Sequence, residues 1–336
     1  MNPSLQPALP SGTHAGMYDL FNGDADGICA LHQLRMLAPR NSHLLTGTKR
    51  DIALLEKLPS GMSLDVTVLD LSFDRNEVGV RQVLQSGGRV LYFDHHAAHK
   101  LFSHPQLECH IDQSMDVCTS LLVDRHLGGL FRHWTIVAAY GDNLPALADY
   151  LAQASACTAA VRTALAQLGN LLNYNAYGET TSDLFFHPAQ LYQSVHRFES
   201  PLDFIAKAHE YQCLAEGYAA DLRCLHELKP HAQNALAVVY VLPDKAWARR
   251  ISGTLANRLV TQSLGQSIAV LTPRTDGNFL VSVRVTPTVE ARADSFCSRY
   301  PGGGGRYAAG GIDRLPASEL DRFITAFFYY LTGHSR

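Results

Sequence analysis

The chain has 336 residues, of which 46% are hydrophobic and 18% are charged, and its formal net charge is −3. This composition excludes wholesale disorder, and the slightly acidic balance argues against a general duplex DNA-binding protein. No apolar run reaches the ~18 residues of a membrane-spanning helix, so no membrane partner is expected. The length predicts two domains.

The N-terminal residues and the cysteines bear on the cellular setting. Residues 1–16 contain neither a basic nor an apolar segment, so they are predicted to form a disordered tail rather than a signal peptide. The seven cysteines are odd in number and include no CxxC pair, which argues against a disulfide framework and a structural zinc site. A reducing, cytoplasmic location is the simplest interpretation.

Residues 17–200 are predicted to form an α/β domain with a parallel sheet. Apolar strands alternate with helices, a pattern typical of a sheet covered on both faces. The strands are expected at 17–21, 65–71 and 89–93, and the helices at 28–37 and from 74 to the glycines at 87 and 88. From residue 115 the pattern is helical, with one long helix expected over 145–171.

Residues 201–230 are predicted to be a helical linker, and residues 231–336 a smaller α/β domain. In this second domain, strands are expected at 235–242, 267–272 and 279–285, and helices at 248–262, 290–299 and 317–332. Residues 235–336 hold twelve Lys/Arg and seven Asp/Glu, whereas the rest of the chain holds sixteen and twenty-four. An acidic half joined to a basic half suits a metal-binding domain beside an anion-binding domain.

Acidic residues and histidines follow three predicted strands. Asp24 and Asp26 follow the first, Asp70 ends the second, and the triplet Asp94-His95-His96 follows the third. The carboxyl ends of parallel strands meet at one edge of a sheet, and carboxylates gathered there require cations. Oxygen ligands with imidazole favour Mn²⁺ or Mg²⁺.

These positions also have simpler interpretations. Asp24 and Asp26 could form an ordinary acidic turn, and Asp70 could be a strand-end carboxylate in a turn. Asp142, which lies in Gly-Asp-Asn after a helical run, is a candidate oxygen donor, although an aspartate there is more often a helix cap. The Asp94-His95-His96 triplet after a buried strand is the hardest to explain without a metal.

A run of four glycines, Gly302 to Gly305, precedes Arg306 in the second domain. Glycines let backbone N–H groups approach a phosphate closely, and the alanines at 308 and 309 are expected to begin a helix whose N-terminus favours anions. Arg284, on a predicted strand, could point into the same cleft. A flexible loop and a solvated arginine are the alternatives.

In combination, these motifs resemble those of the DHH phosphoesterase superfamily. The segments FNGDADG, the strand end at Asp70, YFDHH and YGDN stand in the order of the four superfamily motifs. GGGGRYAAGG, preceded by VSVRV, resembles the glycine motif of the DHH-associated C-terminal domain. The resemblance spans about residues 17–311 and is closest to RecJ-like and nano-RNase-like members. It implies a DHH catalytic domain over 17–200 and a substrate-binding domain over 231–336.

The resemblance implies a role for each matching residue. Asp24 would bind one metal ion and Asp26 the other, with Asp70 bridging both. His95 and Asp142 would complete the second ion, His96 would face the substrate phosphate, and Asp94 would orient the histidines. The distal part of the substrate would be held by Arg284, Gly303, Gly304, Gly305 and Arg306.

The chain departs from the superfamily pattern at two positions. Many members begin the first motif with a histidine ligand, where this chain has Asn22. An amide oxygen is a poorer donor, so the first metal is expected to be weakly held or completed by water. Arg306 replaces the usual histidine of the glycine motif, resembles the related domain of alanyl-tRNA synthetases, and would bind phosphate as a permanent bidentate cation.

These residues together predict a Mn²⁺-dependent phosphoesterase, with Mg²⁺ as the alternative ion. Two ions roughly 3.5–4 Å apart would share a hydroxide that attacks phosphorus in line. The expected substrates are short single-stranded oligonucleotides or small nucleotides, with Tyr307 as a candidate for base stacking.

Two alternative functions remain open, one of them enzymatic. The first is an exopolyphosphatase or pyrophosphatase, and the second is a non-catalytic nucleotide sensor, which the Asn22 substitution recommends. The helical stretches at 145–171 and 201–228 are long enough to form a homodimer interface.

Overall fold

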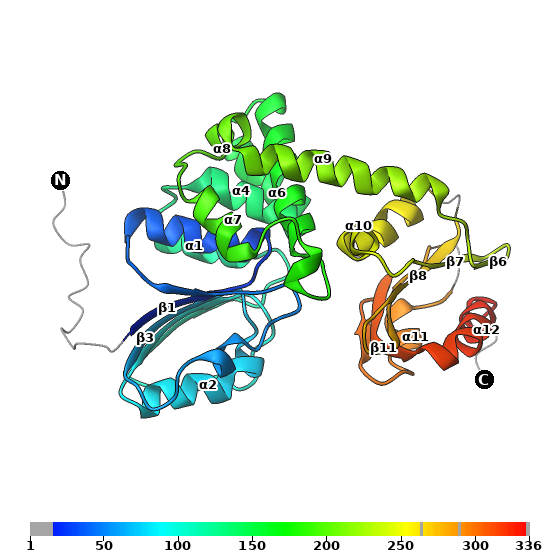
Figure 1. Cartoon of the computed structure of the whole chain (residues 1–336), viewed down its shortest axis with the longest axis horizontal. Coiled ribbons are helices and arrows are strands. Elements are labelled where there is room, and N and C mark those ends of the chain that lie inside the picture. Colours follow the sequence, from blue (N-terminus) through cyan, green and yellow to red (C-terminus); the bar gives the residue numbers. More distant parts are fainter. Residues whose placement is uncertain (1–15, 263–264, 288–289, 334–336) are drawn as a thin grey trace.

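The computed structural model describes residues 16–262, 265–287 and 290–333. Two α/β units, each built on its own sheet, are connected by helix α9 (His209–Cys224), which runs across from one to the other (Figure 1). The expected fold class, a parallel-sheet N-terminal domain with a smaller α/β C-terminal domain, is confirmed. The predicted tail at 1–16 lies, apart from Gly16, outside the described residues. Within the described ranges, no helix is both long and apolar enough to cross a membrane.

The N-terminal sheet has five parallel strands in the order β2-β1-β3-β4-β5. Their bounds are β1 Gly16–Phe21, β2 His43–Leu45, β3 Leu64–Leu69, β4 Arg89–Asp94 and β5 Leu107–Ile111. Strand order reverses between β1 and β3, and ligands of open α/β sheets bind beyond such a switch point. The short edge strands β2 and β5 were not predicted, because neither carries a long apolar run.

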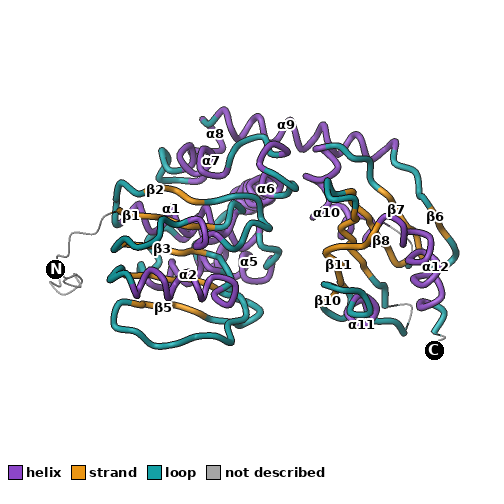
Figure 2. Tube along the Cα trace, turned by 60° about the horizontal axis from the view of Figure 1, so that its bottom comes forward, coloured by secondary structure: helices purple, strands orange, loops and turns teal. Residues whose placement is uncertain are grey.

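Helices cover both faces of this sheet, as predicted. Helix α2 (Phe73–Gln85) packs on one face, and α1 (Ala25–Leu37) packs on the other, in a core shared with the helices that follow β5 (Figure 1). Those helices are α3 Thr119–His126, α4 Arg132–Gly141, α5 Pro145–Ala154, α6 Ala159–Ala176, α7 Pro188–Val195 and α8 Pro201–Lys207. The layers place every β-strand carboxyl end on the side of the sheet that faces the C-terminal domain (Figure 2).

The two long helices expected from sequence are each divided. The prediction over 145–171 is wrong in that α5 ends at Ala154 and α6 begins at Ala159, after Ala156 adopts a positive φ of 53° and Thr158 caps α6. The stretch 201–228 likewise divides at Ala208, whose extended backbone separates α8 from α9. Neither break carries a Gly or Pro signal, which is why local pattern did not reveal it.

The C-terminal sheet has six strands in the order β10-β11-β9-β8-β7-β6. Among the strands that the structure describes here, only β7 and β8 pair in parallel, through the crossover helix α10 (Ala246–Gln262), and β8 and β9 form the predicted hairpin. The strand bounds are β6 Ala232–Gln233, β7 Ala237–Val241, β8 Ser267–Pro273, β9 Asn278–Arg284, β10 Gly303–Gly305 and β11 Ala309–Pro316.

Helices also cover the C-terminal sheet on both faces. Helix α10 packs on one face, while α11 (Ala293–Cys297) and α12 (Leu320–Leu331) pack on the other. The expected helix at 290–299 is therefore shorter than predicted. The prediction of a helix that begins at residues 308 and 309 is wrong, because that segment enters β11.

A buried histidine pair in the N-terminal core makes stability depend on pH. His32 is fully buried, and its Nδ1 lies 3.2 Å from Nδ1 of His196. Burial, reinforced by His196, lowers the pKa of His32 to about 3, against ~6.5 when unfolded. Because the unfolded chain binds this proton more readily, the contribution of His32 to the free energy of unfolding is fully present above ~pH 6.5 and is lost as the pH falls towards 3.

Wild type is therefore expected to lose up to about 2 kcal/mol of unfolding free energy between pH 6.5 and 5 through His32. Urea unfolding at the two pH values measures this loss, and His32→Phe should remove this contribution to the pH dependence. An unchanged pH dependence in His32→Phe would contradict the assignment.

Candidate metal centre and interdomain pocket

Asp24 and Asp26 are positioned by the first turn of α1. Asp24 is the N-cap, and its Oδ1 accepts hydrogen bonds from the backbone N–H groups of Asp26 and Gly27, both at 3.1 Å. Asp26 points towards the start of α3, where its two oxygens accept from the backbone N–H groups of Thr119 and Ser120 at 2.7 Å. The helix begins at Ala25, earlier than predicted, because the Asp24 cap satisfies free N–H groups of the first turn.

Asp70 and Asp142 approach Asp26 from other strands and helices. Asp70 follows β3 with a positive φ of 59°, a conformation that aspartate tolerates better than most residues. Asp142 follows α4, which packs closely on its neighbours at Gly141, where an added Cβ would lie 2.4 Å from Ala25 Cβ. Gly141 thus lets α4 bring Asp142 against α1.

His95 lies between these carboxylates. Its Nε2 is 3.4 Å from Asp70 Oδ1 and 3.6 Å from Asp142 Oδ2. Two ligand groups result in which every donor atom lies within 4.8 Å of the others, Asp70-His95-His96 and Asp26-His95-Asp142. The structure therefore brings together the predicted second-ion residues, from segments more than a hundred positions apart.

Asp24, Asp26, Asp70 and Asp142 form a largely buried cluster of four carboxylates, the acid cluster. Burial and the carboxylate of Asp70 raise the pKa of Asp26 to about 7. Burial and the carboxylate of Asp24 raise the pKa of Asp70 to about 6, and burial raises that of Asp142 to about 6 although Lys49 opposes it. Although burial disfavours the imidazolium, the hydrogen bond to Asp70 raises the pKa of His95 to about 10. Such a cluster favours cation binding.

Asp94 contacts both residues of the histidine pair. It is fully buried, and its oxygens accept from the backbone N–H groups of Phe73, His95 and His96 at 3.3, 2.9 and 3.3 Å. Its Oδ1 also lies 2.6 Å from His96 Nδ1. This contact fixes the ring and leaves Nε2 of the exposed His96 available to a substrate.

Lys49 reaches the same cluster and was not predicted. Its Nζ donates to Asp24 Oδ2 and, at 3.3 Å, to Asn173 Oδ1, and it lies 3.6 Å from Asp142 Oδ1. Although burial works against its charge, Asp24 raises the pKa of Lys49 well above its usual value. Its segment, TGTKRD, lies in a loop with no motif that the sequence analysis used.

Asn22 is buried at the end of β1 beside this cluster. Its Oδ1 has no hydrogen-bond partner among the residues that the structure describes. A buried amide oxygen of this kind is commonly satisfied by an ordered water molecule. None of the close groups of His, Cys, Asp and Glu ligand atoms among the described residues includes Asp24.

A pocket of about 480 Å³ adjoins the cluster and lies between the domains. Thr48 and Arg50, the two neighbours of Lys49, line it together with Tyr177, whose ring is 5.9 Å from Lys49 Nζ. The C-terminal domain contributes Arg249, Ser252, Thr272, Pro273, Arg274 and Leu280. Its volume lies within the ~300–1,000 Å³ typical of small-ligand sites.

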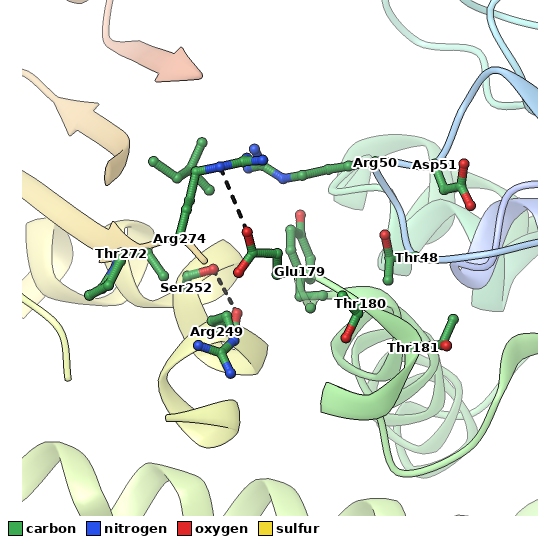
Figure 3. Close-up of a pocket in the computed structure, with 14 residues that line it drawn as sticks. Thr48, Arg50, Asp51, Glu179, Thr180, Thr181, Arg249, Ser252, Thr272 and Arg274 are labelled. Atoms are coloured by element: carbon green, nitrogen blue, oxygen red, sulfur yellow. Dashed lines mark hydrogen bonds and ion pairs between the residues drawn. The ribbon is translucent and has the colours of Figure 1, made fainter. Parts of the chain in front are cut away.

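Two arginines from different domains meet in this pocket. Arg50 reaches from the N-terminal domain towards Arg274, whose guanidinium it meets across the pocket (Figure 3). Glu179 lies beside them, with Oε1 3.9 Å from Arg274 Nε, and also accepts from the backbone N–H of Thr275. Two facing guanidinium groups make this part of the pocket suited to a phosphate or another anion.

Most of the glycine run forms a strand, whereas a phosphate-binding loop was expected. Gly303–Gly305 forms β10, and Arg306 lies in the turn to β11. Arg284 is the last residue of β9 and pairs with Ala309. The structure therefore places Arg284, the glycines and Arg306 on neighbouring strands and the turn between them. None of them lines the interdomain pocket. Tyr307 is 55% exposed under Arg292, whereas Tyr177 lines the pocket.

The glycines differ in why they are needed. An added Cβ at Gly303 would lie 1.9 Å from the carbonyl oxygen of Cys297, whereas one at Gly304 would meet nothing within 4 Å. Gly303 therefore lets the hairpin pack on α11, and only Gly304 presents an open face.

Gly303→Ala is expected to lower the free energy of unfolding by about 1–3 kcal/mol or more, because an overpacked site must shift its backbone. Gly304→Ala is the matched control and should change it by less than about 1 kcal/mol. Urea unfolding of both variants checks the difference. Equal stabilities would show that α11 does not pack on the hairpin as described.

Comparison with solved structures identifies the fold. The structure is similar to RecJ of Thermus thermophilus in complex with Mn²⁺, with a TM-score of 0.56 and 16% identity over 95% of this chain and 52% of that one. A pGpG-specific phosphodiesterase, PggH of Vibrio cholerae, gives a TM-score of 0.57 and 16% identity over 95% and 100%. An exonuclease RecJ bound to manganese gives 0.53 and 17% over 95% and 90%.

These likenesses show that the chain has the fold of RecJ and PggH. The chain spans about half the length of the Thermus RecJ. No family model matches its sequence, and no curated protein matches it.

Proposed function

We propose that this protein is a divalent-metal-dependent phosphoesterase that hydrolyses short oligonucleotides or small nucleotides. The observation that carries this proposal is the convergence of Asp26, Asp70, His95 and Asp142 at the carboxyl edge of the sheet. Burial and mutual repulsion raise the pKa of each of these carboxyls, so a cation is the natural partner of the group.

The donor set fits Mn²⁺. Carboxylate oxygens with one imidazole suit Mn²⁺ or Mg²⁺, and the cluster contains no thiolate within its ligand groups. When bound, such an ion would make water a nucleophile near neutral pH and neutralise charge on the phosphoryl oxygens. Asp26, His95 and Asp142, which form one close ligand group, would hold it, and Asp70 lies 3.4 Å from the same histidine.

His96 is the residue placed to act on the substrate itself. Although burial opposes its charge, the Asp94 carboxylate raises the pKa of His96 to about 9, so the ring carries a proton at neutral pH. With Nδ1 held by Asp94, Nε2 can donate to a phosphate oxygen and then to the leaving oxygen. Asp94 acts through His96, by fixing the orientation of the ring and raising its pKa.

The pocket supports a short, anionic substrate. Arg50 and Arg274 would hold one phosphate from opposite domains, while Tyr177 offers a ring on which a base can stack. A site that lies between two domains limits the length of the substrate that it can hold. The likeness to a pGpG-specific phosphodiesterase along its whole length supports a substrate of dinucleotide size over a long polymer.

A panel assay tests this proposal. Chelator-treated protein is incubated with di- to pentaribonucleotides, phosphoadenosine phosphate, cyclic dinucleotides and polyphosphate, with and without Mn²⁺. We expect Mn²⁺-dependent hydrolysis of a short oligonucleotide or small nucleotide, and loss of that activity in EDTA with recovery on adding Mn²⁺. Release of phosphate from polyphosphate alone would establish the anhydride hydrolase, and nucleotide binding without hydrolysis would establish the sensor.

A further inference from the structure

Lys49 occupies the side of the acid cluster where a first metal ion was expected. Its Nζ makes an ion pair with Asp24 Oδ2, donates to Asn173 Oδ1 at 3.3 Å and lies 3.6 Å from Asp142 Oδ1. Its backbone N–H donates to the carbonyl of Ala176 at 2.9 Å, which ties the loop to the end of α6. The ammonium therefore lies close to oxygen atoms of three residues, Asp24, Asn173 and Asp142.

Asp24 has no oxygen free of other partners. Its Oδ1 accepts two backbone N–H groups as the cap of α1, and its Oδ2 binds Lys49. A metal ion on Oδ2 would stand beside the ammonium, and two cations on one carboxylate oxygen repel strongly in a buried site. Consistently, the close ligand groups of the described residues contain Asp26, Asp70, His95, His96 and Asp142 but not Asp24.

Asn22 offers no strong metal donor on the side of the cluster where the first ion was expected. It stands where the resemblance would place an imidazole, and its side chain is neutral. Of the two residues expected to hold the first ion together with Asp70, one is an amide and the other is paired with an internal cation. The residues present do not fit a second divalent ion.

We propose that the Lys49 ammonium takes the place of the first ion, so that the centre binds one divalent ion, held by Asp26, His95 and Asp142 with Asp70 beside His95. This inference rests on the proposed function and deepens it. It differs from the expectation of two ions. Because Thr48 and Arg50 line the pocket on either side of Lys49 in sequence, the same loop would carry a fixed positive charge at the centre and an arginine towards the substrate.

The number of bound ions tests the inference directly. Chelator-treated wild type, Lys49→Met, Lys49→Arg and the control Lys207→Met are titrated with Mn²⁺ by calorimetry, and each loaded sample is examined by electron paramagnetic resonance. Lys207 is a matched surface lysine, 65% exposed and paired with Asp203. We expect one ion in wild type, Lys49→Arg and Lys207→Met, and two magnetically coupled ions in Lys49→Met.

The spectrum separates the centre from a surface site. Glu108, His110 and His126 also form a close ligand group, but an ion there would not couple to one at Asp70. Circular dichroism establishes that Lys49→Met is folded, and two coupled ions in wild type would overturn the inference even if it is not.

Two outcomes overturn the inference alone. Two coupled ions in a catalytically active wild type would show that Lys49 moves aside for a metal. A single ion in folded Lys49→Met would show that Lys49 is not what excludes the second. No bound ion in wild type, with no metal-dependent hydrolysis, would remove the proposed function as well.

Discussion

Asp70→Asn is expected to lower the rate of metal-dependent hydrolysis by about 10³-fold or more, the size of effect seen when a main charge-stabilising group is removed. Asp70 Oδ1 lies 3.4 Å from His95 Nε2 and accepts from Thr119 Oγ1 at 3.0 Å, in the middle of the acid cluster. The amide keeps the shape of the side chain but removes its charge, so the ion loses a central ligand.

Asparagine is the appropriate replacement because of the backbone at this position. Asp70 has a φ of 59°, and Asn shares the tolerance of Asp for this region, whereas alanine would add strain. Asp70→Asn should therefore unfold at a temperature close to that of wild type. Initial rates on the best substrate of the panel, with Mn²⁺ saturating, give the measurement.

Asp203→Asn provides the control for Asp70→Asn. Asp203 is 50% exposed on α8 and pairs with Lys207, so its replacement should leave the rate within about twofold of wild type. Near-normal hydrolysis by folded Asp70→Asn would exclude the proposed centre.

Arg250→Met is expected to lower the free energy of unfolding by about 3–5 kcal/mol, because it leaves a buried carboxylate without its cation. Arg250 lies on α10 and donates to both oxygens of Asp221 on α9, at 2.8 and 3.1 Å. It also donates to the Tyr174 hydroxyl at 3.1 Å and to the Asp183 carbonyl at 2.6 Å. One side chain thus connects the C-terminal domain to three segments of the rest of the chain.

The burial of this network is what makes the effect large. The Arg250 and Asp221 side chains are only 12% and 8% exposed. The matched control is Arg322→Met, which removes an 82% exposed arginine paired with Glu319 and should change stability by less than about 1 kcal/mol.

Urea unfolding of wild type and both variants measures the difference. Arg250→Met combined with Asp221→Asn should recover part of the loss, since the carboxylate left unpaired is then neutral. Equal, small effects of Arg250→Met and Arg322→Met would show that the network does not hold the domains together.

Much of the candidate centre could be predicted from sequence because its residues directly follow buried strands. An apolar run such as VTVLD carries its own strand signal, and parallel strands necessarily end at one edge of a sheet. The positions of Asp24, Asp70 and the triplet at Asp94 thus follow from local pattern plus one topological rule. The broad division into two α/β domains followed in the same way.

The glycine run shows where local reasoning gave the wrong structure. Glycines allow both a phosphate-binding loop and a strand that packs closely, and nothing in the run itself distinguishes them. The carbonyl of Cys297, 1.9 Å from an added Cβ at Gly303, decides for close packing. That carbonyl belongs to α11, so the reason appears only when the hairpin and the helix are brought together.

The sequence by itself therefore predicted the fold class, the order of the motifs and the gathering of Asp26, Asp70 and His95, whereas Asp142, which follows a helix, was joined to them only by the resemblance. Only the tertiary structure placed Lys49 against Asp24 and Arg50 opposite Arg274. Strand ends are brought together by the periodic hydrogen bonding of a sheet, which the sequence pattern encodes locally. Lys49 and Arg274 lie in loops, whose positions depend on packing between distant segments and on no repeating pattern.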